Sequence, residues 1–196
     1  MKSTEVTVLD EAGVNSLVQG LAGQVFTIAS VKEKPSKRSP YAPFMTSTLQ
    51  QEASRRFRWN AQRTMRVAQG LYERGYITYM RTDSTTLSEQ AINAARTQAA
   101  QLYGADHVAD APRRYDRKVK NAQEAHEAIR PSSTNETFPL PEDLKSKLTS
   151  DEFKMFELIW KRTIACQMSN AEGRNIIVVL EGGGAVFQVS GKTIDF

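Results

Sequence analysis

The segment Tyr79, Met80, Arg81 holds the pair of side chains in this sequence best suited to chemistry on phosphate. Residues 76–80 predict a short strand, and alternation along an extended chain would place Tyr79 and Arg81 on the same side. A phenol oxygen can attack a phosphodiester, while a guanidinium stabilises charge on the phosphoryl oxygens. Because a phenol is almost wholly protonated at neutral pH, a nearby cation or base has to assist. On local grounds alone, a half-buried tyrosine beside a solvated arginine is the commoner explanation.

His126 is the second candidate. It stands with Glu124, Glu127 and Arg130 in a segment expected to form a short helical turn closed by a proline. An imidazole titrates near neutrality, so it could contact a phosphate or carry a proton, although a packed or solvated histidine is the commoner explanation. His107 follows a helix end without comparable neighbours and has no predicted role.

Composition narrows the classes of protein. The 196 residues are 40% apolar and 24% charged, which is typical of a soluble globular protein, and we expect a cytoplasmic location because no membrane span or secretory signal is visible. The single cysteine, Cys166, excludes an internal disulfide framework and lies among apolar residues, which favours helix packing over a reactive thiol. Without a D-x-D, H-E-x-x-H or paired CxxC motif, no Mg²⁺ or Zn²⁺ site is predicted.

Charge is distributed unevenly along the chain. Residues 32–130 contain 18 lysines and arginines against 10 acidic residues, an excess of eight, whereas the remaining residues carry an acidic excess of four. The basic region 32–130 includes a patch formed by Arg113, Arg114, Arg117, Lys118 and Lys120. A basic middle region is a candidate footprint for nucleic acid, because neutralising phosphates releases counterions. Scattered surface cations that only confer solubility remain the alternative.

The elements that must position these residues are mainly helices. Their starts are indicated by side chains that can satisfy free backbone N–H groups, and two of their ends by glycine. Helices are expected from Thr46 with Ser47 and Gln50 as a capping box, from Asn60 to Arg74 before Gly75, from Thr86 with Glu89 to Gly104, and from about Asp151 to Met168 capped by Thr149 with Glu152.

The two ends of the sequence favour β-structure instead. The first residues predict a short strand at 6–9, a helix opened by Asp10 and a strand within 24–31, and the proline-rich, cationic residues 32–43 indicate a domain boundary. The last residues predict strands at 176–180, 185–190 and 193–196, with a glycine turn at 182–184. This order predicts an α+β protein in which a helical domain is inserted into a β-rich domain.

Three stretches together resemble bacterial DNA topoisomerase I, the type IA family. They are PFMTSTLQQEASRR at 43–56, GYITYMRTDSTTLS at 75–88 and NAQEAHEAIRP at 121–131, and their order matches the family. The resemblance implies a winged-helix-like helical domain carrying the catalytic tyrosine, at 39–166, inserted into a β-rich arch domain formed by 1–38 and 167–196. It covers essentially the whole chain.

The resemblance also implies roles for the candidate residues. Tyr79 would attack single-stranded DNA and form a 5′-phosphotyrosine, Arg81 would stabilise the transition state, and His126 would bind a nearby phosphate. Strand passage and religation would then relax negatively supercoiled DNA without ATP. Mg²⁺ is expected on a Toprim domain that is not visible in this sequence, so we expect no cofactor on this segment and no activity from it alone.

The expected partners are single-stranded and negatively supercoiled DNA and the remaining domains of the same polypeptide. We expect a monomer associated with the nucleoid and no membrane. Two other classes stay open: a nonenzymatic winged-helix DNA-binding module, which accounts for the charge but not for the Tyr-Met-Arg motif, and a scaffold fragment without DNA binding.

Overall fold

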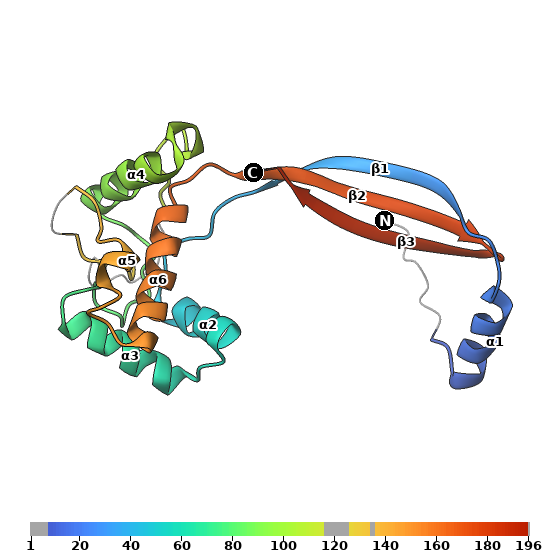
Figure 1. Cartoon of the computed structure of the whole chain (residues 1–196), viewed down its shortest axis with the longest axis horizontal. Helices are drawn as coiled ribbons and strands as arrows, with labels where there is room; N and C mark the ends of the chain where they lie inside the picture. Colours follow the sequence, from blue (N-terminus) through green and yellow to red (C-terminus); the bar gives the residue numbers. More distant parts are fainter. Residues whose placement is uncertain (1–7, 116–125, 134–135, 196) are drawn as a thin grey trace. The chain divides into compact units, whose positions relative to one another are not determined.

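The chain folds into two compact units, described by a computed structural model over residues 8–115, 126–133 and 136–195 (Figure 1). One unit comprises residues 39–170, and the other combines the segments 1–38 and 171–196. The helical unit therefore lies in sequence between two paired strands of the other unit. This mixture of helices and antiparallel sheet agrees with the expected α+β class.

The flanking segments form a three-stranded antiparallel sheet in the order β1, β2, β3. Its strands are β1 (Thr27–Arg38), β2 (Ala171–Gly182) and β3 (Ala185–Ile194). Gly183 and Gly184 alone connect β2 to β3, with φ angles of 58° and 77°. Positive φ at both positions is what a tight hairpin of this twist requires, so the predicted glycine turn is confirmed.

Other expectations for this unit were partly wrong. The helix after Asp10 is confirmed as α1 (Glu11–Leu21), with the Asp10 carboxylate accepting the Gly13 N–H at 2.8 Å. However, β1 continues through Pro35 into the expected boundary segment, which an edge strand tolerates because the missing N–H can face solvent. No separate strand starts at 193, because residues 193–194 are the end of β3. Half of the strand expected at 6–9 lies outside the described residues, and its other half, Val8 and Leu9, is not in a strand.

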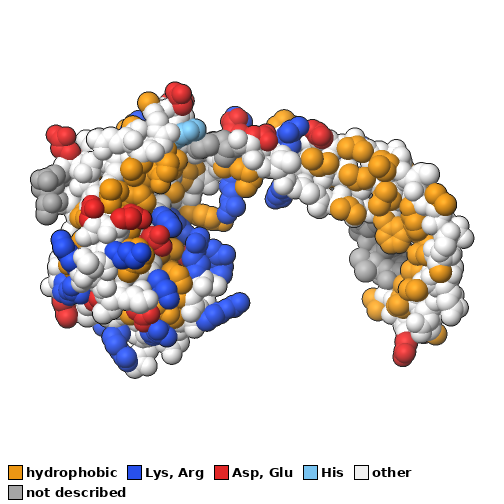
Figure 2. Space-filling view, in the orientation of Figure 1, with side chains coloured by type: hydrophobic (Ala, Val, Ile, Leu, Met, Phe, Trp, Pro, Cys, Tyr) orange, Lys and Arg blue, Asp and Glu red, His pale blue; other side chains and the backbone are white. Residues whose placement is uncertain are grey.

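One face of the sheet is apolar over two neighbouring rows of paired residues. Residues paired directly across antiparallel strands share a face, and one such row joins Val31, Val178 and Val189 while the next joins Ile28, Leu180 and Phe187. These side chains stay partly or largely exposed, as the apolar surface of the sheet in Figure 2 illustrates. The buried hydrophobic cluster described for this chain lies wholly in the helical unit.

The helical unit begins its helices largely where the sequence indicates. Asn60 accepts the Arg63 N–H, and Thr149 with Glu152 forms the expected capping box. Two caps differ from the expected ones by a few residues. The helix that starts at Glu89 is capped by Ser88 and not by Thr86. At the helix that starts at Thr46, Thr48 Oγ1 accepts the Met45 N–H in place of the Ser47–Gln50 box. The elements are α2 (Thr46–Phe57), α3 (Ala61–Glu73), α4 (Glu89–Tyr103), η1 (Ala105–His107), α5 (Pro141–Leu144) and α6 (Ser150–Ala165).

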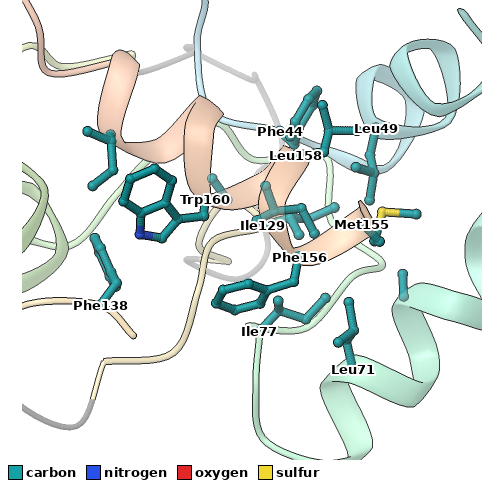
Figure 3. Packing of buried hydrophobic residues seen from close by; sticks show 14 of the residues in the cluster. Phe44, Leu49, Leu71, Ile77, Ile129, Phe138, Met155, Phe156, Leu158 and Trp160 are labelled. Atoms are coloured by element: carbon teal, nitrogen blue, oxygen red, sulfur yellow. The ribbon is translucent and has the colours of Figure 1, made fainter. Parts of the chain in front are cut away.

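Helix α6 forms the centre of the core. Met155, Phe156 and Ile159 on this helix are fully buried, and Figure 3 shows the Phe156 ring beside Ile77, which belongs to the segment following α3. Phe44, from the segment preceding α2, is buried in the same cluster. The segments that flank the helices are thus held by apolar burial as well as by backbone hydrogen bonds.

Two local expectations in the helical unit were wrong. Residues 76–80 do not form a regular strand, since only Ile77 makes a bridge, to Pro131. The described part of the expected helical turn, residues 126–131, is also not helical, because Ile129 bridges to Phe44; residues 121–125 lie outside the described part. Across the part of the chain that the structure describes, no helix has the length and apolar character needed to span a membrane.

Candidate active site

Tyr79 lies on the segment that follows α3 and presents its ring at the surface, with 43% of the residue exposed. The ring contacts Tyr72 edge-on, with 5.2 Å between the ring centroids. Its hydroxyl forms no hydrogen bond with any residue that the structure describes. Tyr79 is therefore exposed, and no described residue engages its phenol oxygen in a hydrogen bond.

Burial alternates along this segment although it is not a regular strand. Met80 and Thr82 are 1% and 7% exposed, whereas Tyr79 and Arg81 are exposed. The two inward side chains anchor the segment to the core of the helical unit, so the two outward ones project away from it. Alternation thus puts both candidate groups on the solvent side of the segment.

Thr46, at the start of α2, fixes the backbone on both sides of Arg81. Its Oγ1 donates to the Met80 carbonyl oxygen at 2.8 Å and accepts the Thr82 N–H at 2.9 Å. Its own N–H donates to the Thr82 carbonyl oxygen, also at 2.9 Å. One residue of α2 therefore holds the peptide groups that flank the candidate arginine.

Thr78 makes the corresponding connection on the other side of Tyr79. The Thr78 N–H donates to the Arg130 carbonyl oxygen at 2.9 Å, and its Oγ1 donates to the Ala128 carbonyl oxygen at 2.8 Å. The Arg130 N–H returns a bond to Thr78 Oγ1 at 3.0 Å. The tyrosine segment and the segment that begins at His126 are consequently joined through their backbones.

Arg81 and His126 line the same surface hollow, which has a volume of about 660 Å³. Both side chains are exposed, and Tyr79 is not part of the lining. The tertiary structure thus brings Arg81 and His126 to one cavity although 45 positions separate them in the sequence. The other residues of the lining are Met45, Thr46, Ser47, Gln50, Thr82 and Asp83.

A second hollow, of about 510 Å³, is also lined by Arg81. Besides Arg81, its lining comes entirely from α3: Gln62, Met65, Arg66, Gln69 and Glu73. Arg81 is the residue shared by the two hollows. Its guanidinium can therefore reach a ligand in either hollow.

Most arginines of the helical unit are engaged in structural contacts. Arg55 and Arg56 bind Glu52, and the hydrogen bond from Arg55 is the main reason that the pKa of Glu52 falls to about 2. Arg63 binds Asp151 at 2.7 Å, and Arg74 binds Glu152 at 3.0 Å. The pairs of Arg63 and Arg74 connect different elements of the fold, and all four arginines keep little capacity for an external anion.

Arg81 belongs to a small group of arginines without such contacts. Among the arginines described in the helical unit, only the side chains of Arg58, Arg66 and Arg81 form no hydrogen bond, ion pair or ring contact with a described residue. Figure 2 shows cationic side chains gathered on one face of this unit. An uncommitted guanidinium keeps all five donors available for a phosphate.

Comparison with known proteins places the whole chain in one family. A family model described as DNA topoisomerase matches residues 1–196. The chain belongs to the DNA topoisomerase family. The expected resemblance to bacterial DNA topoisomerase I, the type IA family, is thereby confirmed.

Individual topoisomerases match at high identity. The chain is 58% identical to DNA topoisomerase 1 of Mycolicibacterium smegmatis, over 98% of this chain, and 54% identical to that of Streptomyces coelicolor, over 100% of it. It spans 21% of the length of each of these relatives. The structure of full-length topoisomerase I from Thermotoga maritima matches with a TM-score of 0.73 and 32% identity, covering 98% of this chain and 31% of that one.

In this topoisomerase segment the structure also shows the surroundings of three other residues that the sequence pointed to: Cys166, Arg113 and His107. Cys166 ends α6 fully buried, and burial raises the pKa of its thiol to about 12, so the expected packing role is confirmed. Arg113 binds the Met168 carbonyl oxygen and the Asn170 side chain. His107 ends η1 and lines neither hollow beside Arg81.

Sequence reasoning missed the residues of this topoisomerase segment that position the tyrosine. Thr46 was expected only as a helix start and Thr78 only as part of a strand, and neither type carries a local signal of a contact to a distant backbone. Arg66 was not singled out either, because its lack of an ion-pair partner among the described residues depends on the tertiary fold. The described residues contain no cluster of three or more His, Cys, Asp or Glu that could hold a metal ion.

Proposed function

We propose that this chain is the segment of a type IA DNA topoisomerase that carries the nucleophile, Tyr79. The complete enzyme would relax negatively supercoiled DNA, without ATP, by transient cleavage of one strand. The observation that carries this proposal is the exposed Tyr79 hydroxyl, free of hydrogen bonds to described residues, two positions from the unpaired Arg81 guanidinium. Membership of the topoisomerase family supports it.

The proposed reaction is a reversible transesterification. The Tyr79 oxygen attacks the phosphorus of a phosphodiester and loses its proton, while the bond to the 3′ oxygen breaks and that oxygen takes up a proton. The product is a 5′-phosphotyrosine and a free 3′ hydroxyl. Attack by that hydroxyl reverses each step and reseals the strand, so the bond energy is retained in the phosphotyrosine throughout strand passage.

Arg81 is proposed to bind the phosphoryl oxygens as negative charge builds on them. A planar guanidinium can donate two parallel hydrogen bonds to a phosphate, and this one forms no hydrogen bond with a described residue. His126 is proposed to contact a neighbouring part of the DNA backbone from the hollow that it shares with Arg81. The Thr46 and Thr78 contacts keep the segment in place during the reaction.

The domain names follow from the same proposal. Residues 39–166 would be the tyrosine-carrying domain, and residues 1–38 with 167–196 two segments of a β-rich arch domain. A relation of the helical unit to winged-helix domains is also only proposed. The described residues of this unit contain isolated bridges and no regular two-stranded wing. The proposed partners are single-stranded DNA and the remaining domains of the polypeptide, with the enzyme acting as a monomer.

Magnesium does not fit the residues described for this segment, which hold no suitable cluster of acidic, histidine or cysteine side chains. The proposal therefore assigns the ion to a Toprim domain of the complete enzyme and routes no step of Tyr79 or Arg81 through it. The isolated segment is accordingly proposed to be inactive.

The test compares Tyr79→Phe with Tyr72→Phe in the complete enzyme. Both changes remove one phenol oxygen from an exposed residue, and the two rings contact each other. Labelled single-stranded DNA is trapped with each variant and separated on a denaturing gel. We expect a covalent adduct from the wild type and from Tyr72→Phe, and none from Tyr79→Phe, which should still bind DNA noncovalently.

An adduct formed by Tyr79→Phe would move the nucleophile elsewhere. DNA binding without an adduct from any of the proteins, the wild type included, would favour a nonenzymatic DNA-binding module instead.

A further inference from the structure

The hollow between Arg81 and α3 has the character of an anion site. Arg66 and Arg81 both line it, and neither guanidinium has a partner among the described residues. The lining carries one carboxylate, that of Glu73, which accepts a hydrogen bond from the Gln69 amide at 2.7 Å. Two cations against one carboxylate leave a net positive charge on this surface.

The geometry of α3 explains why these side chains converge. Positions 62, 66, 69 and 73 are spaced by four, three and four residues, so they lie along one face of the helix. The opposite face is buried through Thr64, Ala68 and Leu71, which fixes the rotation of the helix about its axis. Core packing therefore directs Gln62, Arg66 and Gln69 towards the hollow.

Hydrogen-bond capacity points to a phosphate group as the occupant. Arg66 and Arg81 each offer five N–H donors, and the Gln62 amide adds two more. The described residues of the lining include no aromatic ring, so the hollow lacks a surface on which a base could stack. Backbone phosphates of a nucleic acid strand match this set of donors.

We propose that this hollow binds a second phosphate of the cleaved DNA strand, adjacent to the one attacked by Tyr79, and that Arg66 is its principal ligand. This inference rests on the proposed function, because it takes the strand to be held at Arg81. With Arg81 shared by the two hollows, the strand runs along α3 on one side of the arginine and past His126 on the other. Arg66 then sets the position of the strand relative to the tyrosine.

The chain supplies a matched control for Arg66. Arg58 is also exposed and unpaired among the described residues, but it lines neither hollow. Arg66→Gln and Arg58→Gln change the net charge equally, so nonspecific attraction of DNA should be affected equally. Both are made in the complete enzyme carrying Tyr79→Phe, so that binding stays noncovalent, and their thermal unfolding is compared with that of the parent.

The first measurement is the affinity for a single-stranded oligonucleotide as a function of salt. Each phosphate contact on a single strand contributes about 0.7 to the slope of log K against log salt concentration. We expect Arg66→Gln to reduce that slope by about this amount and to weaken binding, and Arg58→Gln to leave both near the parent values. Equal slopes for the two variants would overturn the proposal.

The second measurement replaces single phosphates of the oligonucleotide by neutral methylphosphonates, around the cleavage position mapped with the enzyme that retains Tyr79. The Tyr79→Phe parent should lose affinity at one position next to the scissile phosphate, and Arg66→Gln should lose nothing further there. Equal losses in both proteins would also refute the assignment. If Arg66→Gln proves unfolded, Arg66→Lys, which keeps the charge but not the paired donors, takes its place in this scan.

The two hypotheses fail in different ways. Absence of any covalent adduct from the wild-type enzyme removes the proposed function. A normal adduct combined with indistinguishable behaviour of Arg66→Gln and Arg58→Gln removes only the second phosphate site.

Discussion

Replacing Thr46 by valine tests whether the backbone around Arg81 has to be held in place for cleavage. Valine keeps the branched shape of threonine but removes the hydroxyl that binds the Met80 carbonyl and the Thr82 N–H. The backbone bond from the Thr46 N–H to the Thr82 carbonyl can persist. The change therefore removes two hydrogen bonds, one on each side of Arg81, together with the longer 3.0 Å contact of the same O–H with the Thr82 carbonyl oxygen. Little packing volume is lost.

The expected magnitude follows from those two bonds. A typical intramolecular hydrogen bond contributes about 1 kcal/mol net, and a buried group left without a partner costs about 1–3 kcal/mol. We therefore expect Thr46→Val to lose about 2 kcal/mol of the free energy that holds residues 80–82 in place. If all of it serves the reactive arrangement, cleavage slows by roughly 30-fold, because about 1.4 kcal/mol corresponds to a factor of ten in rate.

The assay is single-turnover formation of the covalent adduct on a labelled single-stranded oligonucleotide, well below the unfolding temperature. Thr163→Val is the matched control, since the buried Thr163 hydroxyl donates to the Ile159 carbonyl oxygen within α6 and contacts neither hollow. We expect both valine variants to lose stability, only Thr46→Val to lose rate, and Thr46→Ser to recover the rate. A destabilised Thr46→Val enzyme that cleaves at the wild-type rate would refute the positioning role.

Two further predictions concern charged groups of the same unit. Arg81→Lys should reduce the rate of adduct formation by at least about tenfold, because an ammonium is a point charge that cannot make two directed bonds to a phosphate; equal rates would show that only the charge matters. Burial opposes ionisation of Glu127, but hydrogen bonds from Arg130 and Ser88 outweigh it and lower its pKa below the usual 4.5. A carboxyl with a lowered pKa stabilises the folded state above that value and loses its contribution as the pH falls through the folded-state pKa. The stability difference between wild type and Glu127→Gln, from urea unfolding, should thus be full at pH 7 and shrink below pH 4.5; a difference independent of pH would contradict this assignment.

Local physical chemistry was sufficient to predict most helices and the hairpin of this protein. Asp10, Asn60 and Thr149 satisfy free N–H groups at helix starts, and this contact depends only on residues three positions away. The glycines at 183–184 permit the positive φ angles of a tight turn regardless of the surroundings. Such signals act over a few residues, so they can be recognised without knowing the fold.

Expectations that depended on partners far along the chain were less reliable. Residues 76–80 have strand-like composition, yet among the described residues they form a single bridge, because the segment around Pro131 that they pair with is short. In contrast, β1 extends through Pro35 to Arg38, beyond its apolar core, because β2 supplies a continuous partner along that length. Strand length is set by the neighbouring strand, which is distant in sequence and unknown from the local pattern.

The candidate site divides in the same way. Residue types and a family resemblance pointed to Tyr79, Arg81 and His126 from the sequence, since a nucleophile beside a cation has a recognisable chemistry. Only the tertiary structure placed Arg81 and His126 on one hollow and bound Thr46 to the peptide groups around Arg81. It also left Arg66 without a hydrogen-bond or ion-pair partner among the described residues, while most other described arginines found one. Whether a guanidinium is free for a ligand depends on which carboxylates the fold brings within about 4 Å of it, and that distance is decided by the packing of helices far apart in the sequence.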